Sequence, residues 1–426
     1  MNKIQEFESA LLGEKYTKIE HSSGLRIYVC QKDVSTTYGI MCVDFGGSVT
    51  EYEIDGKTYT IPEGCAHFLE HKLFDNPNGT NADEVFSSLG AYSNAYTSNN
   101  RTAYFFSTTS NVDACLEHLV YYVTNPYFTK QTVDKEMGII GEEIRGCIDD
   151  PYDRCYLACL DGMYYENPVK NEICGSEQSI SEITAETLYK CCEHFYVPSN
   201  MTLCVCGNVT VEQVLEAVDK QLKLSPASKP KVKAFCEPKG VKRAYSESEM
   251  PVGKPLFSIG IKDDTVIKDG YERLCRGEAI SLLLHMLFSQ SGKFYLDMLE
   301  RGLISPGLDF GYSSNDTTAF VMISGESDDP KTLLDEIKKY VSECKENGLS
   351  AKDLEREKKC LYSSYVSCFD SSEDIAFTLN SYSWEGIDNF IFPSVIESID
   401  IETVRGLLDS VFVDSAYTLS VIKCQE

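Results

Sequence analysis

The chain of 426 residues repeats itself, and this repeat limits the folds that it can adopt. AHFLEHKLF at 66 to 74 aligns with ISLLLHMLF at 280 to 288, and YTSNNRTAYFF from Tyr96 aligns with YSSNDTTAFVM from Tyr312. A third pair joins VDKEMGIIGEEIRGCID from Val133 to LEREKKCLYSSYVSCFD from Leu354. Because the matches occur in the same order in both halves, the sequence predicts two copies of one domain.

A stretch rich in Pro, Lys and Ser separates the two copies, from Leu224 to Glu247. Such a composition is typical of a connecting segment, although residues 233 to 236 could form a short strand. We therefore expect one domain at 1–223, a linker at 224–247 and a second domain at 248–426. Each domain is long enough to bury a full hydrophobic core.

Each half mixes short strands with long amphipathic helices. Alternating or apolar runs predict strands at 25–29, 38–45 and 102–107, and apolar positions spaced by three and four residues predict helices between them. This pattern favours the α+β class, with helices packed on one face of a mainly antiparallel sheet.

The string His67-Phe68-Leu69-Glu70-His71 has the spacing of a zinc site. At about 100° per residue on a helix, the two imidazoles lie one turn apart on the same side. Glu70 lies close enough to deprotonate a water molecule on the metal without being a ligand itself. The order H-x-x-E-H is that of the inverzincins. The alternative to a zinc site is that the two histidines only pack on an amphipathic helix. The presence of His67, Glu70 and His71 together at this spacing favours catalysis.

Zinc in a catalytic site needs a third protein ligand. The segment from 129 to 148 has an apolar seam at Val133, Met137, Ile140 and Ile144, which predicts an amphipathic helix. Glu136 and Glu143 flank this seam together, whereas Glu142 points to the opposite side. Periodicity thus leaves Glu136 and Glu143 as candidate ligands, with a solvated acidic face as the alternative.

The second copy lacks these residues. Ser281 replaces His67, Leu284 replaces Glu70 and Ser364 replaces Glu143. His285, which aligns with His71, is expected to be a core or structural histidine because its neighbours are leucines. We expect one zinc ion per chain, in the first domain.

The strings HFLEH, GAYSNAYTSNNRTAYFF at 90 to 106 and EMGIIGEEI at 136 to 144 resemble the M16 metallopeptidases. This family includes pitrilysin, insulysin and the mitochondrial processing peptidase, and the chain is most similar to bacterial members of about this length. The resemblance implies that Glu143 is the third ligand and that Glu136 supports it from behind. It also implies two domains facing each other across an enclosed cavity, in which Asn94, Ala95 and Tyr96 line an extended peptide.

The family also uses an Arg and a Tyr of the second half to stabilise the reacting oxyanion. Here Arg301 and Tyr312 are present at a different spacing. The resemblance therefore predicts the zinc-bearing subunit of a two-chain peptidase, with a zinc-less M16-like chain as partner or a homodimer. A catalytically silent assembly subunit and a structural zinc protein are the alternatives.

Composition restricts the partners. The net charge of −27 disfavours nucleic acid and would attract cationic peptides, although it could serve solubility alone. No signal-peptide core and no run of about 18 apolar residues occur, so a cytoplasmic protein without a membrane span is expected. The 18 scattered cysteines predict reduced thiols.

Overall fold

The computed structural model describes residues 2–77, 79–225 and 227–425, and the chain forms two compact units. Unit 1 comprises residues 1–144, 172–233 and 366–390, and unit 2 comprises residues 145–171, 234–365 and 391–426. Neither unit is continuous in sequence, since each contains a segment from the other half of the chain.

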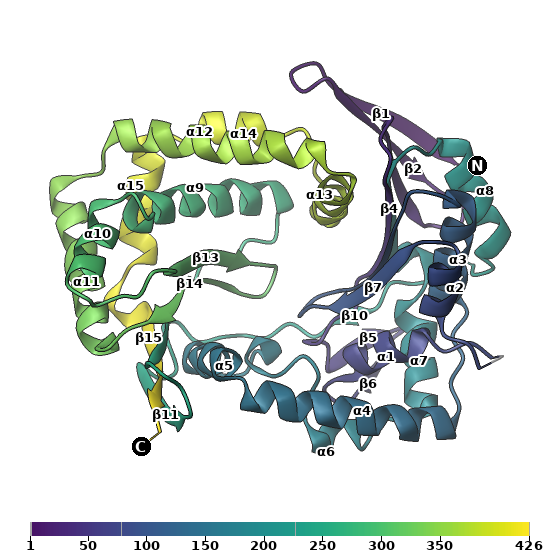
Figure 1. The fold of residues 1–426 in the computed structure, drawn as a ribbon, viewed down its shortest axis with the longest axis horizontal. Helices are drawn as coiled ribbons and strands as arrows, with labels where there is room; N and C mark the ends of the chain where they lie inside the picture. The colour runs from purple at the N-terminus through teal and green to yellow at the C-terminus, as the bar shows by residue number, and fades with distance from the viewer. Residues whose placement is uncertain (1, 78, 226, 426) are drawn as a thin grey trace. The chain divides into compact units, whose positions relative to one another are not determined.

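The core of unit 1 is a seven-stranded sheet in the order β1-β2-β3-β9-β4-β8-β7 (Figure 1). Every neighbouring pair is antiparallel except β3 and β9. The central strands β4 and β9 are buried along their whole length. The strands are β1 (Lys3–Ser9), β2 (Glu14–Glu20), β3 (Arg26–Gln31), β4 (Thr37–Val43), β7 (Tyr92–Thr97), β8 (Thr102–Thr108) and β9 (Met201–Gly207).

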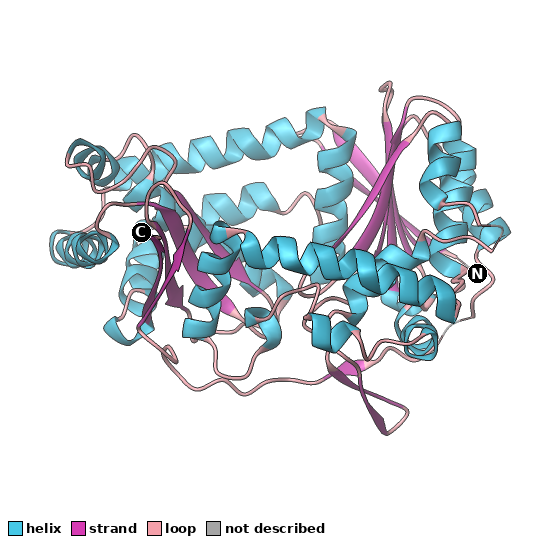
Figure 2. Ribbon diagram, turned by 60° about the horizontal axis from the view of Figure 1, so that its bottom comes forward, coloured by secondary structure: helices cyan, strands magenta, loops and turns pink. Residues whose placement is uncertain are grey.

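Helices cover this sheet on both faces, which is why β4 and β9 have no exposed side. Figure 1 shows α3 and α8 on one side of β4 and α13 on the other. Figure 2 shows the twist of the strands between these layers. The helices of unit 1 are α1 (Cys65–Leu73), α2 (Ala82–Ser88), α3 (Val112–Thr124), most of α4 (Lys130–Asp149), α6 (Glu177–Ile180), α7 (Ala185–Phe195), α8 (Val211–Gln221) and α13 (Ser372–Glu385).

Unit 2 repeats the central topology. Its five-stranded sheet has the order β11-β15-β12-β14-β13, and its single parallel pair, β11 and β15, corresponds to β3 and β9. The strands are β11 (Tyr245–Met250), β12 (Leu256–Lys262), β13 (Asp309–Ser314), β14 (Ala319–Glu326) and β15 (Tyr417–Cys424). The helices are α5 (Pro151–Met163), α9 (Gly270–Phe288), α10 (Lys293–Glu300), α11 (Pro330–Asn347), α12 (Ala351–Ser367), α14 (Phe392–Ser398) and α15 (Ile401–Val411). The expected α+β class and the duplication are confirmed. The expectation of helices on one face of the sheet is wrong for unit 1, because α13 from the second half of the chain covers the face opposite α3 and α8.

The copies are not complete duplicates. In the part of the chain that the structure describes, β1, β2 and the small sheet β10-β5-β6 have no counterpart in unit 2. The small sheet consists of β5 (Glu51–Ile54), β6 (Lys57–Thr60) and β10 (Lys231–Val232).

Each half of the chain gives one helix to the sheet of the other half. Helix α5, from the first half, packs on β12 and β15 of unit 2. Glycines make this approach possible, because a Cβ on Gly260 would lie 2.8 Å from Sγ of Cys159, and one on Gly162 would lie 2.4 Å from Oγ1 of Thr418. Helix α13, from the second half, packs on β4 and β9 of unit 1, where the ring of Phe377 lies 5.9 Å from that of Tyr38.

The segment expected as a linker, 224–247, contains strand residues and the hydrogen-bonding side chain of Glu237. Within it, β10 lies at Lys231–Val232 rather than at 233–236, and β11 begins at Tyr245. The chain passes from unit 1 to unit 2 after residue 233. The carboxylate of Glu237 accepts the backbone N–H groups of residues 165, 166 and 167 at 2.9, 2.8 and 2.6 Å. The domain limits 1–223 and 248–426 stay a prediction about the repeat, beside the discontinuous compact units.

No helix of the described residues is long and apolar enough to cross a lipid bilayer. The 18 cysteines are free thiols, most of them buried.

Candidate metal centre

Helix α1 carries both histidines of the H-x-x-E-H string. Phe68, Leu69 and Leu73 are buried and fix one side of the helix in the core. His67 and His71 occupy the other side, with ring centroids 4.7 Å apart. Gly64 starts the helix at a φ of 86°, and a Cβ there would lie 2.4 Å from the carbonyl oxygen of Cys174. Close backbone packing therefore sets where the helix begins.

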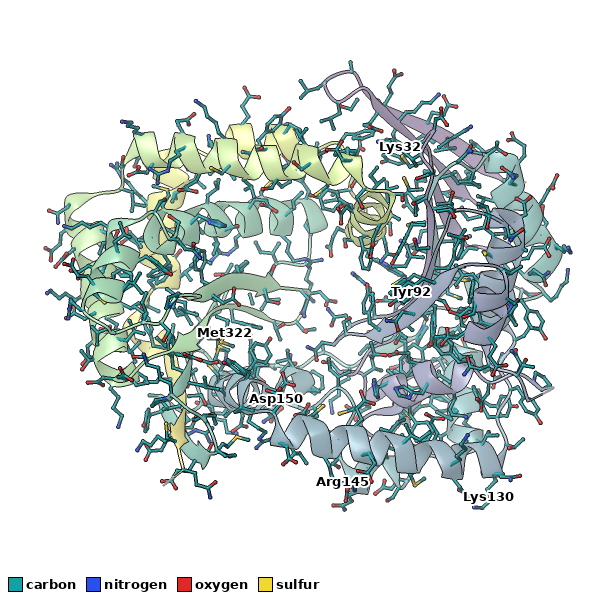
Figure 3. The ribbon with its side chains drawn as sticks, in the orientation of Figure 1. Lys32, Tyr92, Lys130, Arg145, Asp150 and Met322 are labelled. Carbon is teal, nitrogen blue, oxygen red and sulfur yellow. The ribbon has the colours of Figure 1, made fainter. Side chains whose placement is uncertain are left out.

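Helix α4 brings Glu143 to the two histidines. Its bounds, Lys130–Asp149, agree with the helix expected at 129–148. Nε2 of His67 lies 3.4 Å from Oε1 of Glu143, and Nε2 of His71 lies 3.5 Å from Oε2 of the same carboxylate. Figure 3 labels Lys130 at the start of α4 and Tyr92 on β7, the strand beside the site.

These three side chains fit a zinc ion. One ligand atom from each of His67, His71 and Glu143 can be chosen such that all three lie within 4.8 Å of one another. Zinc bonds of about 2.0–2.2 Å in a tetrahedron set neighbouring ligands about 3.3–3.6 Å apart, in agreement with the two nitrogen-to-oxygen distances. Nδ1 of His67 is buried without a hydrogen-bond partner among the described residues, as is common at functional sites. Three protein ligands would leave one position of a tetrahedral zinc ion for a water molecule.

Glu136 lies behind the site rather than in it. Its Oε1 is 3.1 Å from Nδ1 of His71, and its Oε2 is 3.6 Å from Nζ of Lys72. Because a carboxylate only accepts, Nδ1 of His71 carries the proton and its Nε2 is free to bind a metal. Lys72 is only 1% exposed and also pairs with Asp75. Burial would raise the pKa of Glu136, but the hydrogen bond from His71 and the charge of Lys72 together lower it.

Two further pKa values follow from this arrangement. The hydrogen bond from His67 is the largest cause that lowers the pKa of Glu143. Burial would lower the pKa of His71, but the hydrogen bond to Glu136 and the neighbouring carboxylates raise it overall. Without metal, Glu136 and Glu143 thus tend to be charged, and His71 holds its proton more tightly than usual.

Glu70 is 9% exposed and points toward β7, where Thr97 donates a hydrogen bond from Oγ1 to its Oε2. Burial raises the pKa of Glu70, and the Thr97 bond opposes that rise. A carboxylate with a raised pKa beside a metal site is suited to proton transfer near neutral pH.

The expected peptide-lining residues lie on β7, which is the end strand of its sheet. Asn94 is exposed, and its side chain bonds the backbone N–H of Ala95 and the hydroxyl of Tyr92. The ring of Tyr96 stacks on Phe377 of α13 at 6.0 Å. The structure thus places Asn94 and Ala95 at an unpaired edge, while Tyr96 also packs against the exchanged helix.

The second copy holds no comparable cluster among the described residues. Leu284 is fully buried, as an apolar replacement for Glu70 would be. His285 is exposed, so the expectation of a core histidine is wrong, although its ring packs on Phe310 at 5.2 Å. Helix α9 buries Leu283 and Leu284, and this rotation turns residue 285 outward.

Arg301 and Tyr312 bond to different acids. Arg301 pairs with Asp297 at 3.2 Å and Glu336 at 2.8 Å on the surface. The hydroxyl of Tyr312 donates to Asp263 at 2.9 Å, and Arg276 binds the same buried carboxylate at 2.8 Å. No hydrogen bond or shared partner of the described residues joins Arg301 to Tyr312.

Sequence reasoning missed Thr97 and Lys72. Lys72 follows His71 directly, and a lysine inside the buried stretch of a predicted helix is a signal that it has an acidic partner. Thr97 follows the predicted peptide-lining residues, but its contact with Glu70 depends on how β7 crosses α1.

Comparisons with known proteins identify the family of the chain. The description "Insulinase (Peptidase family M16)" matches residues 58–177, and "Peptidase M16 inactive domain" matches residues 182–361. A Bacillus subtilis protein named "Uncharacterized zinc protease YmfH" is 35% identical over 411 residues, 95% of this chain and 96% of that protein. A "Probable mitochondrial-processing peptidase subunit beta" of Arabidopsis thaliana is 31% identical over 190 residues, 40% of this chain and 36% of that protein. The crystal structure of a putative M16-like peptidase from Alicyclobacillus acidocaldarius superposes with a TM-score of 0.91 at 25% identity, covering 100% of this chain and 99% of that one.

Proposed function

This chain belongs to the M16 family of peptidases, and from that premise we propose that it is a zinc-dependent endopeptidase or oligopeptidase. The proposal assigns one zinc ion per chain to His67, His71 and Glu143. The observation that carries it is the convergence of two imidazole Nε2 atoms on Glu143, at 3.4 and 3.5 Å, beside the buried carboxylate of Glu70.

In the proposed reaction, zinc would acidify a water molecule and polarise the carbonyl group of the scissile peptide bond. Glu70 accepts the proton of the attacking water and later delivers it to the leaving amine nitrogen. Glu136 holds Nδ1–H of His71 and keeps Nε2 directed at the metal position. Removing Glu70 would therefore remove proton transfer without removing a metal ligand.

The proposed substrate is an extended peptide that joins the edge of β7 at Asn94, Ala95 and Tyr96. Among the described residues β7 pairs only with β8, so one row of its backbone groups can bind another strand. Recognition through the backbone demands little of the peptide sequence. The net charge of −27 would favour cationic peptides.

The finer proposal is that this chain is the zinc-bearing subunit of a two-chain enzyme, with a zinc-less M16-like chain or a second copy as partner. Two observations support it. Arg301 and Tyr312 have separate acidic partners, so neither is free to act with the other on an oxyanion. A relative is named as a beta subunit of a processing peptidase. The enclosed cavity stays a prediction, as does the cytoplasmic location, which 18 free thiols favour.

The alternatives are a silent assembly subunit and a structural zinc protein. A structural site is closed by a fourth protein ligand, whereas the cluster here has three members among the described residues. A silent subunit would not need a buried carboxylate beside the metal.

The test is cleavage of a fluorogenic peptide by zinc-loaded chain, alone and with the chain that copurifies with it. We expect about one zinc per chain, strong cleavage only with the partner, and none with Glu70→Gln in the same complex. Full activity of the isolated monomer would contradict the subunit role. Activity that survives in Glu70→Gln would contradict the catalytic assignment.

A further inference from the structure

Thr97 provides the only hydrogen bond to the side-chain carboxylate of Glu70 that is found among the described residues. The donor is Oγ1 of Thr97, at the last position of β7, and the acceptor is Oε2 of Glu70. Thr97 is also 3.3 Å from the hydroxyl of Thr102, its cross-strand neighbour on β8. Thr102 donates its own proton to the carbonyl oxygen of Phe45 at 2.8 Å. Both Thr102 and Glu70 could accept from Thr97, but the contact with the Glu70 carboxylate is much shorter than the 3.3 Å contact with Thr102, so the single proton of Thr97 goes to Glu70.

The turn that follows Thr97 is held in place on two sides. Across the turn, the backbone N–H of Ser98 donates to the carbonyl of Arg101 at 2.7 Å. From the neighbouring loop, Gly47 and Ser48 donate their N–H groups to the carbonyls of Ser98 and Asn99, both at 2.9 Å. This loop packs so closely that a Cβ on Gly46 would lie 2.4 Å from the backbone nitrogen of Arg101.

This rigid turn fixes the backbone of Thr97, and a β-branched side chain has few rotamers to choose from. Its hydroxyl is thus fixed relative to α1, which carries Glu70. The same strand, at residues 94–96, is the proposed docking edge for the peptide. One strand would therefore align both the substrate and the base that serves it.

We infer that Thr97 is a positioning residue for the proposed peptidase reaction: its hydroxyl engages Oε2 of Glu70 and leaves Oε1 as the atom that takes the proton of the attacking water. The inference rests on the proposed function. The proton moves from the water oxygen to Oε1 and then to the leaving amine nitrogen, while Thr97 keeps its own proton throughout. Without the hydroxyl, the carboxylate is free to rotate and either oxygen could turn away from the water.

The test compares three variants of the full chain in its complex with the copurifying partner. Thr97→Val removes the hydroxyl and keeps the shape, and Thr97→Ser keeps the hydroxyl and removes the methyl group. Thr108→Val is the matched control, since Thr108 is a buried threonine at the far end of β8 whose hydroxyl bonds the backbone of Ser110 and does not contact Glu70. Each variant is measured for zinc content, kcat and KM, and the zinc-free chains are crystallised.

We expect Thr97→Val to keep zinc and KM while kcat falls about ten- to a hundredfold, as for the loss of a hydrogen bond to a charged group. Thr97→Ser should recover most of kcat, and Thr108→Val should match the wild type. The crystal structures, which do not depend on activity, should show the Glu70 carboxylate turned in Thr97→Val and unchanged in Thr97→Ser.

Three kinetic results would overturn the positioning role in an active enzyme: an unchanged kcat in Thr97→Val, a change in KM alone, or no recovery in Thr97→Ser. A change in KM alone would mean that Thr97 acts on peptide docking. An unmoved Glu70 in the Thr97→Val crystal would overturn it as well. If the wild-type complex cleaves no peptide, the proposed function itself fails, whatever the crystals show about Glu70.

Discussion

Nδ1 of His71 lies 3.1 Å from Oε1 of Glu136, which comes from a different helix and a position 65 residues away. This contact fixes both the tautomer and the orientation of the imidazole, so that Nε2 faces Glu143. The binding of a metal by His71 is thus set by a residue that need not touch the metal.

Glu136→Gln should weaken zinc binding by about ten- to a hundredfold, because an amide can present its NH₂ group to Nδ1 and no longer favours the tautomer that binds metal. Competition with a chelator of known affinity measures the change. Glu142→Gln is the control, since Glu142 lies on the same helix and is exposed. Equal losses in both variants would mean that only the net charge of α4 matters.

Glu70→Gln should bind about one zinc per chain and lose peptide cleavage, because an amide cannot accept the proton of the water. His67→Ala, His71→Ala and Glu143→Gln should lose zinc, since each removes one of three ligands. Metal analysis of dialysed protein and a fluorogenic peptide assay separate the two classes. Loss of zinc in Glu70→Gln would make Glu70 a ligand and contradict its assignment as base.

The carboxylate of Glu237 should make the folding stability of the chain depend on pH. Burial raises its pKa, but three backbone N–H donors and Lys262 lower it overall from the ordinary value of 4.5. A lowered folded-state pKa means that its stabilisation is complete above about pH 4.5 and is lost as the pH falls through the folded-state value. Glu237→Gln should destabilise the chain by about 1–3 kcal/mol at pH 7, and its melting temperature should change less than that of the wild type between pH 7 and 3.

Thermal unfolding at these pH values measures the effect. Glu166→Gln is the control, because Glu166 contributes only its backbone N–H to Glu237 and its side chain is exposed. If the melting temperatures of the wild type and of Glu237→Gln change equally with pH, the charged carboxylate of Glu237 does not stabilise the folded chain.

Cutting the chain between its halves should expose the exchanged helices. Residues 1–233 lack α13, whose Ile375 and Leu379 are each 2% exposed in the structure, and would leave β4 and β9 uncovered. We expect this fragment to be insoluble or to bind a hydrophobic dye. Coexpression with residues 234–426 should restore a soluble complex that contains both chains. A folded and monodisperse fragment 1–233 would show that α13 is dispensable for unit 1.

Individual elements could be predicted from the spacing of residues along the sequence. The helix expected at 129–148 is found at Lys130–Asp149, because a spacing of three and four apolar residues is a property of one helix alone. The pair His67 and His71 was predicted for the same reason, since helical geometry alone places them one turn apart. The sheet order also follows the repeat, as shown by the matching parallel pairs β3 with β9 and β11 with β15.

Burial around single residues was harder to predict. His285 has leucine neighbours in sequence, but the helix buries three consecutive leucines and turns the histidine outward. Helices α5 and α13 were not among the individual elements predicted from the sequence. Hydrophobic periodicity does not identify the surface on which a helix packs, so it could not show that each one packs on the sheet formed by the other half.

The sequence by itself determined the duplicated α+β architecture and the set of chemically capable residues, since both depend on spacing along one chain. Tertiary structure decided which atoms meet: Nε2 of His67 and of His71 at Glu143, Nδ1 of His71 at Glu136, and the hydroxyl of Thr97 at Glu70. These contacts join residues 27 to 76 positions apart. They depend on the crossing of α1, α4 and β7, which is set by the packing of whole elements and not by the local sequence around any one of these side chains.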